Sequence, residues 1–443
     1  MDNSPLIFIQ LNEVNFDFVE HYVRKYNDLP AFAHVLSTFH KIETHGEEAY
    51  EELEPWIQWV SVQTGKTYAE HCVFRLGDVV KAPDDLVQVF EALEERGLRV
   101  GAISPMNARN RLKHPAYFIP DPWTDTPADG SGFSTRLSAM LRQTVNENAS
   151  GRISARSVIT LLEALVFSFS LRGTQDLIRT IAATRRQPWI KALVLDRLLH
   201  LVHLRLLQLR RPDVSFAFLN AGAHIQHHYM LNAEPAGARS CNPSWYVPAD
   251  ADPVRDMLKV YDSILGDYLE LQKIGAKVLI ATGLTQVPYE RVKFYYRLKD
   301  HLDFLKLIGT APVRVLPRMT RDFEAEFANE AQAAQAADQL AALTLERDGR
   351  PVFGEIDQRG TQVFVTLTYP DEIRPNDTLV RSNGDRIQDF GTMVTFVAIK
   401  NGMHSTRGFA FLSPNAQAPS QLDGPCHVAR LFDLTLSVAI PRL

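Results

Sequence analysis

Short apolar runs alternate with segments of helical periodicity along much of the chain. Apolar runs of this length, bounded by polar residues, are typical of strands buried in a sheet. The 257–271 segment has apolar residues at helical spacing and predicts an amphipathic helix. Alternation of such elements is typical of an α/β fold with a mainly parallel sheet. The predicted strands are Leu6–Leu11, 99–103, Val214–Leu219 and Lys277–Ala281.

The pattern changes between residues 124 and 212, where helical periodicity dominates. This part is predicted to be a helical insertion in the α/β fold. Its last segment, 189–211, is apolar on nearly all sides and has arginines at both ends. A helix of this kind is either buried in the insertion or lies against a membrane surface or a partner.

A second insertion is predicted at residues 321–385. An Ala- and Gln-rich segment, 321–345, predicts a helix, and two strands of a hairpin follow at 351–356 and 361–368. The α/β core is then expected to consist of 1–123, 213–320 and 386–443.

The composition of the chain argues against some classes of protein. The formal net charge of −5 gives no case for nucleic-acid binding. The three cysteines are far apart, which fits a reducing compartment. No apolar run reaches the roughly 18 residues of a transmembrane helix. A cytoplasmic protein, with possible membrane association through 189–211, is expected.

Candidate chemistry is concentrated after the strand Val214–Leu219. His224, His227 and His228 follow it within five residues, after the loop signal Asn220-Ala-Gly222. On a helix, His224 and His228 would share one face. Polar side chains beyond the carboxyl end of a buried strand lie where open α/β sheets bind ligands.

The order of several segments resembles the alkaline phosphatase superfamily, in its type I phosphodiesterase/nucleotide pyrophosphatase branch. The opening strand, ending in Leu11-Asn12-Glu13, is similar to the family's strand ending in Leu-Asp-Gly. The segment Ala223-His-Ile-Gln-His227 is similar to its Asp-Arg-Val-Gln-His, and Met403-His404…Gly408 to its closing His…Gly. The resemblance implies an alkaline-phosphatase-like sheet between helices, and in that family two metal ions, usually zinc, flank a Thr or Ser nucleophile.

Most of that apparatus is replaced here. The family's first-strand Asp falls on Asn12, its nucleophile on Pro55, and the Asp before its metal-binding His on Ala223. His227 and His404 remain at expected ligand positions. The resemblance therefore implies a rebuilt cleft rather than the two-metal mechanism. On the family fold, polar residues of several strand ends converge: Asn12, Glu13, Asn15, Glu54, Gln58, His224, His227, His228, Thr282, Gln286 and His404.

Two enzyme hypotheses follow for a phosphate-ester, sulfate-ester or glycosyl substrate. In one, a single zinc or other divalent metal is held by His227, His404 and a third ligand such as His224 or His228. In the other, without metal, Glu54 or Glu13 is base or nucleophile, and histidines bind the anion and move protons. The substrate-binding candidates are Asn12, Asn15, Gln58, Trp56, Gln286 and Thr282.

A third hypothesis is a non-catalytic relative that binds a phosphorylated or sugar ligand, or a partner protein, in the same cleft. The loss of family ligands favours it.

Overall fold

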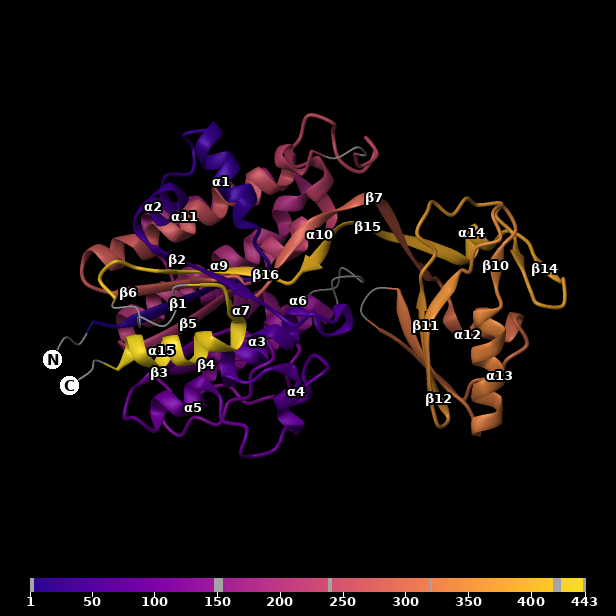
Figure 1. The fold of residues 1–443 in the computed structure, drawn as a ribbon, viewed down its shortest axis with the longest axis horizontal. Helices are drawn as coiled ribbons and strands as arrows, with labels where there is room; N and C mark the ends of the chain where they lie inside the picture. Colours follow the sequence, from indigo (N-terminus) through magenta and orange to yellow (C-terminus); the bar gives the residue numbers. More distant parts are fainter. Residues whose placement is uncertain (1–3, 147–153, 238–240, 319–320, 417–423, 441–443) are drawn as a thin grey trace. The chain divides into compact units, whose positions relative to one another are not determined.

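The computed structural model describes residues 4–146, 154–237, 241–318, 321–416 and 424–440. The chain forms two compact units (Figure 1). The first contains Met1–Gly237, Asp250–Pro288 and Gly402–Leu443, and the second contains Ala238–Ala249 and Tyr289–Asn401.

An eight-stranded sheet forms the centre of the first unit. Its order is β17-β2-β16-β6-β1-β5-β3-β4. The five strands from β6 to β4 are mutually parallel, whereas β16 runs antiparallel to both of its neighbours. The expected mainly parallel α/β sheet is therefore confirmed. The strands are β1 Leu6–Leu11, β2 His40–His45, β3 Val100–Ile103, β4 Tyr117–Ile119, β5 Val214–Leu219, β6 Lys277–Ala281, β16 Arg407–Leu412 and β17 Cys426–His427.

Helices cover the two faces of this sheet (Figure 1). One face packs on α3 Pro55–Thr64, α5 Val89–Glu94 and α15 Leu431–Ala439, and Phe8 and Phe216 belong to that core. The opposite face carries α1 Phe16–Lys25, α2 Pro30–Thr38, α9 Lys191–Arg210, α10 Ala221–Tyr229 and α11 Pro253–Lys273. Strands β1 and β5 are buried along their whole length, which explains their continuous apolar runs, whereas the edge-side strand β2 is polar and partly exposed.

The predicted helical insertion contains α6 Gly132–Asn146, α7 Ala155–Phe167, α8 Leu171–Ala183 and α9. Helix α9 is buried around most of its circumference, including Leu193, Arg197 and His203. The proposal that 189–211 lies on a membrane surface is therefore wrong, because this segment packs against the other helices of its unit. No helix among the described residues is both long enough and apolar enough to cross a bilayer.

The second unit has its own core, built around a four-stranded sheet in the order β11-β12-β9-β8. It extends beyond the predicted insertion 321–385, because α12 and β8 share this core. Its elements include α12 His301–Leu307, β8 Arg314–Pro317, β9 Asp322–Glu326, α13 Glu330–Ala341, β10 Thr344–Leu345, β11 Phe353–Arg359, β12 Gln362–Leu367, β13 Leu379–Val380, β14 Arg386–Ile387 and α14 Phe390–Met393. Strands β7 Thr285–Leu298 and β15 Val394–Ser405 pair with each other and contain two of the points where the chain passes between units.

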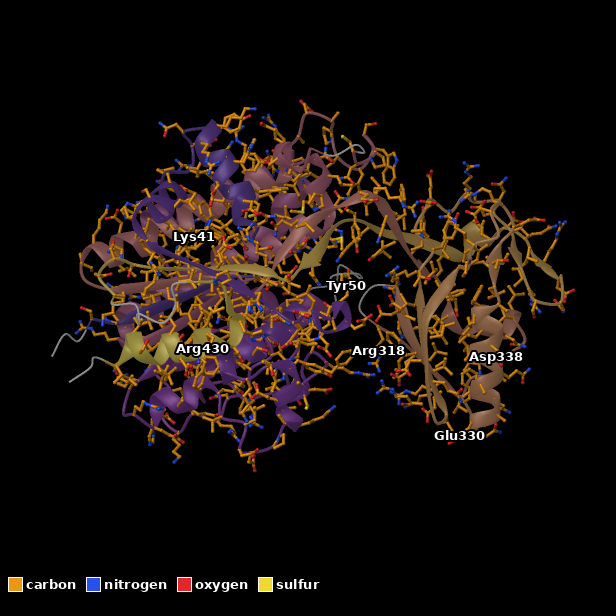
Figure 2. All side chains as sticks on the ribbon, viewed as in Figure 1. Lys41, Tyr50, Arg318, Glu330, Asp338 and Arg430 are labelled. Atoms are coloured by element: carbon orange, nitrogen blue, oxygen red, sulfur yellow. The ribbon has the colours of Figure 1, made fainter. Side chains whose placement is uncertain are left out.

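The segment 321–345 is not one helix as predicted. Strand β9 precedes α13 because Phe323 and Ala325 alternate with polar residues and enter the core beside β12. Helix α13 buries Ala333 and Leu340 and leaves Glu330 and Asp338 on its outer surface (Figure 2).

Candidate metal centre

Glu13 lies in the turn that follows β1, at the carboxyl edge of the parallel sheet. Its backbone is left-handed, with φ of 61°. A non-glycine residue in a sparsely populated conformation costs about 1–3 kcal/mol unless its surroundings hold it there. Two contacts do so here: the Glu13 N–H donates to the Thr282 carbonyl at 3.0 Å, and its own carbonyl accepts from Gln226 Nε2 at 2.8 Å. The turn thus fixes the position of a buried carboxylate.

The Glu13 carboxylate is oriented by amide donors. Asn12 Nδ2 donates to Glu13 Oε1 at 3.1 Å and to Asn220 Oδ1 at 2.8 Å, while Asn12 Oδ1 accepts from Trp59 Nε1 at 2.7 Å. Gln286 Nε2 donates to Glu13 Oε2. Asn12 therefore acts as a support for Glu13, with its own amide held by Trp59 and Asn220.

His227 approaches Glu13 from α10. Its Nδ1 lies 3.2 Å from the Gly402 carbonyl oxygen, so this nitrogen carries a proton and donates it. Its Nε2 lies 3.1 Å from Glu13 Oε2. In the neutral ring this Nε2 bears a lone pair directed at the carboxylate.

His404 approaches the same oxygen from β15. Its Nε2 lies 3.2 Å from Glu13 Oε2 and 3.3 Å from His227 Nε2. On its other side, Nδ1 lies 3.5 Å from Glu54 Oε2. A carboxylate beside Nδ1 favours the tautomer that leaves the Nε2 lone pair free to bind a cation.

Three electron-donating atoms thus converge within 3.1–3.3 Å of one another. Such an arrangement of Glu13, His227 and His404 is repulsive unless a proton or a metal cation lies among them. Burial acts to raise the pKa of Glu13, but the charges and hydrogen bonds of His227 and His404 outweigh it and hold that pKa well below the usual range. The carboxylate is therefore ionised as long as positive charge lies beside it, and either protonated histidines or a metal cation bound by the neutral rings can supply that charge.

The donor set and its spacing fit a divalent metal. Two imidazole nitrogens and one carboxylate oxygen occur as ligands of catalytic zinc, which keeps a further position open. Ligand bonds of about 2.0–2.1 Å in a tetrahedron place the donors about 3.3 Å apart. Among the described residues, Glu13, His227 and His404 are the group of this kind that could hold an ion. Their side chains are 2%, 16% and 10% exposed, so the histidine side of the centre opens to solvent.

Glu54 stands beside this centre without capping its own helix. It is the N-cap residue of α3, yet its side chain makes no capping hydrogen bond and instead faces His404. Pro55 occupies the first helical position, as the sequence indicates. The structure thus brings together four predicted residues: Glu13, Glu54, His227 and His404.

The substrate-binding candidates are mostly engaged in internal hydrogen bonds. Asn15 caps α1 and donates to the Gln286 carbonyl at 2.7 Å. Thr282 Oγ1 accepts from the Phe409 N–H at 2.9 Å, and Gln58 Nε2 donates to the Glu52 carbonyl at 3.0 Å. The Trp56 indole is half-buried and donates to the Phe74 carbonyl at 3.0 Å.

His224 and His228 form a ring pair on α10, with centroids 4.7 Å apart. They do not belong to the group that contains Glu13 and His227. The i, i+4 relationship expected for a helix is present. A role for either side chain in proton transfer stays a prediction.

Sequence reasoning did not identify Gln226, Asn220 and Gly402 as parts of the site. Gln226 connects two turns, because its Oε1 accepts from the Asn15 N–H at 2.9 Å while its Nε2 holds the Glu13 carbonyl. Gly402 contributes its backbone carbonyl, which accepts from His227, and a pattern of side chains cannot predict such a contact. The nearest signal was the position of Gln226 directly before His227.

No protein-family model matches the chain, and no curated protein matches its sequence. Solved structures similar to it include phosphonoacetate hydrolase from Sinorhizobium meliloti 1021, with TM-score 0.42, 11% identity, and 99% of this chain and 96% of that chain covered. Human ectonucleotide pyrophosphatase/phosphodiesterase 5 has TM-score 0.41 and 10% identity, with coverage of 99% and 96%. Alkaline phosphatase PafA has TM-score 0.44 and 9% identity, with coverage of 97% and 94%.

These likenesses are too loose to inform the substrate or the mechanism, which must come from the residues of the site.

Proposed function

We propose that this protein is a hydrolase of phosphate or sulfate esters with one divalent metal ion, zinc being favoured. The observation that carries the proposal is the convergence of Glu13 Oε2, His227 Nε2 and His404 Nε2 at 3.1–3.3 Å. Each histidine has its Nδ1 engaged by an acceptor, and the carboxylate is held by amides. Three preorganised donors with one open side are typical of a catalytic metal rather than a structural one.

The charges of the site support an anionic ester as substrate. A divalent cation among the ligands would more than offset the charge of Glu13. The carboxylate of Glu54 lies on the far side of the His404 ring, 3.5 Å from Nδ1, so the open side of the centre would stay positive. The N-terminus of α3 adds a partial positive charge at Glu54, of the kind that favours phosphate and related anions. A neutral glycosyl substrate would use neither feature.

The residues divide into ligands and positioning groups. Glu13, His227 and His404 would hold the metal, which when bound polarises an oxygen of the ester. Glu54 fixes the tautomer and orientation of His404. Asn12 and Gln286 fix the rotamer of Glu13 through their amide donors.

The nucleophile of the proposed reaction is water. Pro55 stands where the resembling family has a Thr or Ser and has no hydroxyl group. Water attacks phosphorus or sulfur and releases a proton to solvent, while the bond to the ester oxygen breaks and the alcohol leaves with a proton from solvent. A covalent intermediate at position 55 is excluded by the side chain.

A non-catalytic protein with the same metal centre is the second candidate. It is favoured by one observation: Asn15, Gln58 and Thr282 are buried in internal hydrogen bonds, which leaves few polar side chains to orient a substrate.

A cytoplasmic location stays a prediction from composition.

Turnover by the full chain separates the two candidates. The panel is p-nitrophenyl phosphate, bis-p-nitrophenyl phosphate and p-nitrophenyl sulfate, tested before chelation, after chelation and after zinc is restored. We expect turnover that chelation abolishes and zinc restores, and that His227→Ala lowers by more than about 100-fold. His114→Ala, which changes an exposed histidine outside the site, is the matched control. Zinc-loaded protein that turns over no panel member would favour the binding protein.

A further inference from the structure

Helices α7 and α8 carry their large apolar side chains on the outside. In α7 the buried positions are Ser157, Thr160 and Ala164, which are small or polar. The exposed positions hold Val158, Ile159, Leu161, Leu162 and Val166. This is the reverse of the usual arrangement, in which the apolar stripe of a surface helix faces the core.

The same reversal continues through α8. Its buried side contains Gly173, Leu177 and Thr180, and Gly173 lies directly against Leu201 of α9. Its exposed side contains Leu171, Ile178 and Ile181 at helical spacing. Two successive helices therefore present apolar surface to solvent, which in soluble proteins marks an interaction site.

The turn between the helices is the most exposed part of this surface. Val166 is 78% exposed and Leu171 is 76% exposed, and Phe169 lies between them in the chain and is also exposed. Together these three residues form an apolar corner at the end of α7 and the start of α8.

Basic residues are interspersed with the apolar residues along this segment. The segment 154–191 contains six Lys or Arg and two acidic residues, whereas the whole chain has a net charge of −5. Both acidic residues form ion pairs, Glu163 with Arg136 and Asp176 with Arg179. The basic residues of the segment are all exposed: Arg156, Arg172, Arg179, Arg185, Arg186 and Lys191.

We propose that the outer face of α7 and α8 docks on an anionic lipid membrane, with the Val166–Phe169–Leu171 corner inserted among the lipids. Amphipathic helices bind an interface by burying apolar side chains beside basic residues that attract anionic headgroups. A protein partner would need a matching acidic and apolar surface, whereas a fluid anionic bilayer offers both features to any arrangement of the two helices. The proposed membrane contact is therefore this surface and not α9, because α9 is buried.

The test is co-sedimentation of the full chain with vesicles. Vesicles of phosphatidylcholine alone are compared with vesicles of equal parts phosphatidylcholine and phosphatidylglycerol, at low and high salt. We expect binding to the anionic vesicles that salt weakens, because counter-ions screen exposed charges. The double variant Phe169→Glu/Leu171→Glu is expected to weaken binding by more than about 10-fold.

Two further variants separate the contributions. The double variant Arg185→Gln/Arg186→Gln removes two exposed charges. The loss of each charge is expected to weaken binding by about 5-fold. Ile274→Glu is the matched control, because Ile274 is 81% exposed and lies outside the two helices; its binding should equal that of the unaltered chain.

The absence of binding to anionic vesicles at low salt would overturn the proposal, and so would binding that Phe169→Glu/Leu171→Glu leaves unchanged. If light scattering finds a dimer that this double variant converts to a monomer, the surface binds a second copy of the chain and the lipid proposal is also wrong.

Discussion

Glu13 Oε2 and His227 Nε2 lie 3.1 Å apart, although one residue follows the first strand and the other lies on α10. Parallel strands β1 and β5 are neighbours in full register from Leu6↔Val214 to Leu11↔Leu219. The turn after β1 and the helix after β5 therefore meet at one edge of the sheet. The pairing of β1 with β5 therefore brings Glu13 and His227 together at the metal centre.

Glu13→Gln should weaken metal binding by more than about 100-fold, which exceeds the 10–100-fold typical of outer-shell changes. Glutamine keeps the shape of the side chain but removes the charge that offsets the cation. The measurement is competition with a chromogenic zinc chelator. Glu51→Gln, an exposed change, serves as control. Equal affinities of the two variants would remove Glu13 from the ligand set.

Glu54→Gln should weaken metal binding by about 10-fold, less than the loss of a ligand. The carboxylate lies 3.5 Å from His404 Nδ1 and acts by orienting that ring. A partly exposed charge at a helix start adds little to stability, so the melting temperature of the metal-free protein should stay the same. A larger loss than in Glu13→Gln would mean that Glu54 is itself a ligand.

Gly402→Ala tests how the support around Glu13 works. A Cβ at Gly402 would lie 2.1 Å from Gln286 Oε1 and 3.0 Å from the Gln226 carbonyl oxygen. Gln286 must then move, and Glu13 loses a donor. We expect zinc affinity to fall by about 10-fold, measured by the same competition.

Gly266→Ala is the matched glycine control. Gly266 lies inside α11, and a Cβ there would meet nothing within 4 Å. Alanine in a helix interior is expected to stabilise by about 0.5–1 kcal/mol, with no effect on zinc affinity. If Gly402→Ala leaves the zinc affinity unchanged, as Gly266→Ala is expected to do, Gln286 does not support the centre.

Asp196 gives a prediction for pH. This carboxylate, on α9, accepts from the Ala221 N–H at 2.8 Å and from Tyr261 Oη at 2.7 Å, and so holds the start of α10. Burial raises its pKa from 3.8 to about 6. Because its pKa is raised, Asp196 keeps its proton in the folded state at pH values where the unfolded chain has lost it. The contribution of Asp196 to stability is therefore fully present below about pH 4 and is lost as the pH rises through about 6.

The size of this effect is on the order of 2–3 kcal/mol between pH 4 and pH 6.5. Asp196→Asn removes it, so the free energy of unfolding of the variant relative to the unaltered chain should rise over that interval. Chemical denaturation at several pH values measures the difference, with the exposed Asp125→Asn as control. A pH-independent difference would contradict the assignment.

Strands β1, β3, β5 and β6 were predictable because they are buried and consist of continuous apolar runs. Strands β2 and β17 are partly exposed and lack such a run. Glu13 and His227 could be placed near one edge for the same reason. His404 could be placed only through the family resemblance, since β15 alternates between burial classes without a clear pattern. The carboxylate as third member of the group could not be foreseen, because it depends on the left-handed turn at Glu13.

Other features needed tertiary contacts that no local pattern contains. The apolar character of α9 did not reveal whether it is covered, whereas α7 and α8 have less conspicuous sequences and expose more apolar surface. In the second unit, an Ala-rich sequence favoured one long helix, but pairing with β12 made its first residues a strand.

Metal content of the purified full chain tests the central claim most directly. After exposure to zinc and removal of the free ion, elemental analysis should find about one zinc ion per chain in the unaltered protein and in His224→Ala. His227→Ala and His404→Ala should each retain almost none. An unaltered chain without bound metal, or a His404→Ala variant that keeps its full zinc, would contradict the account.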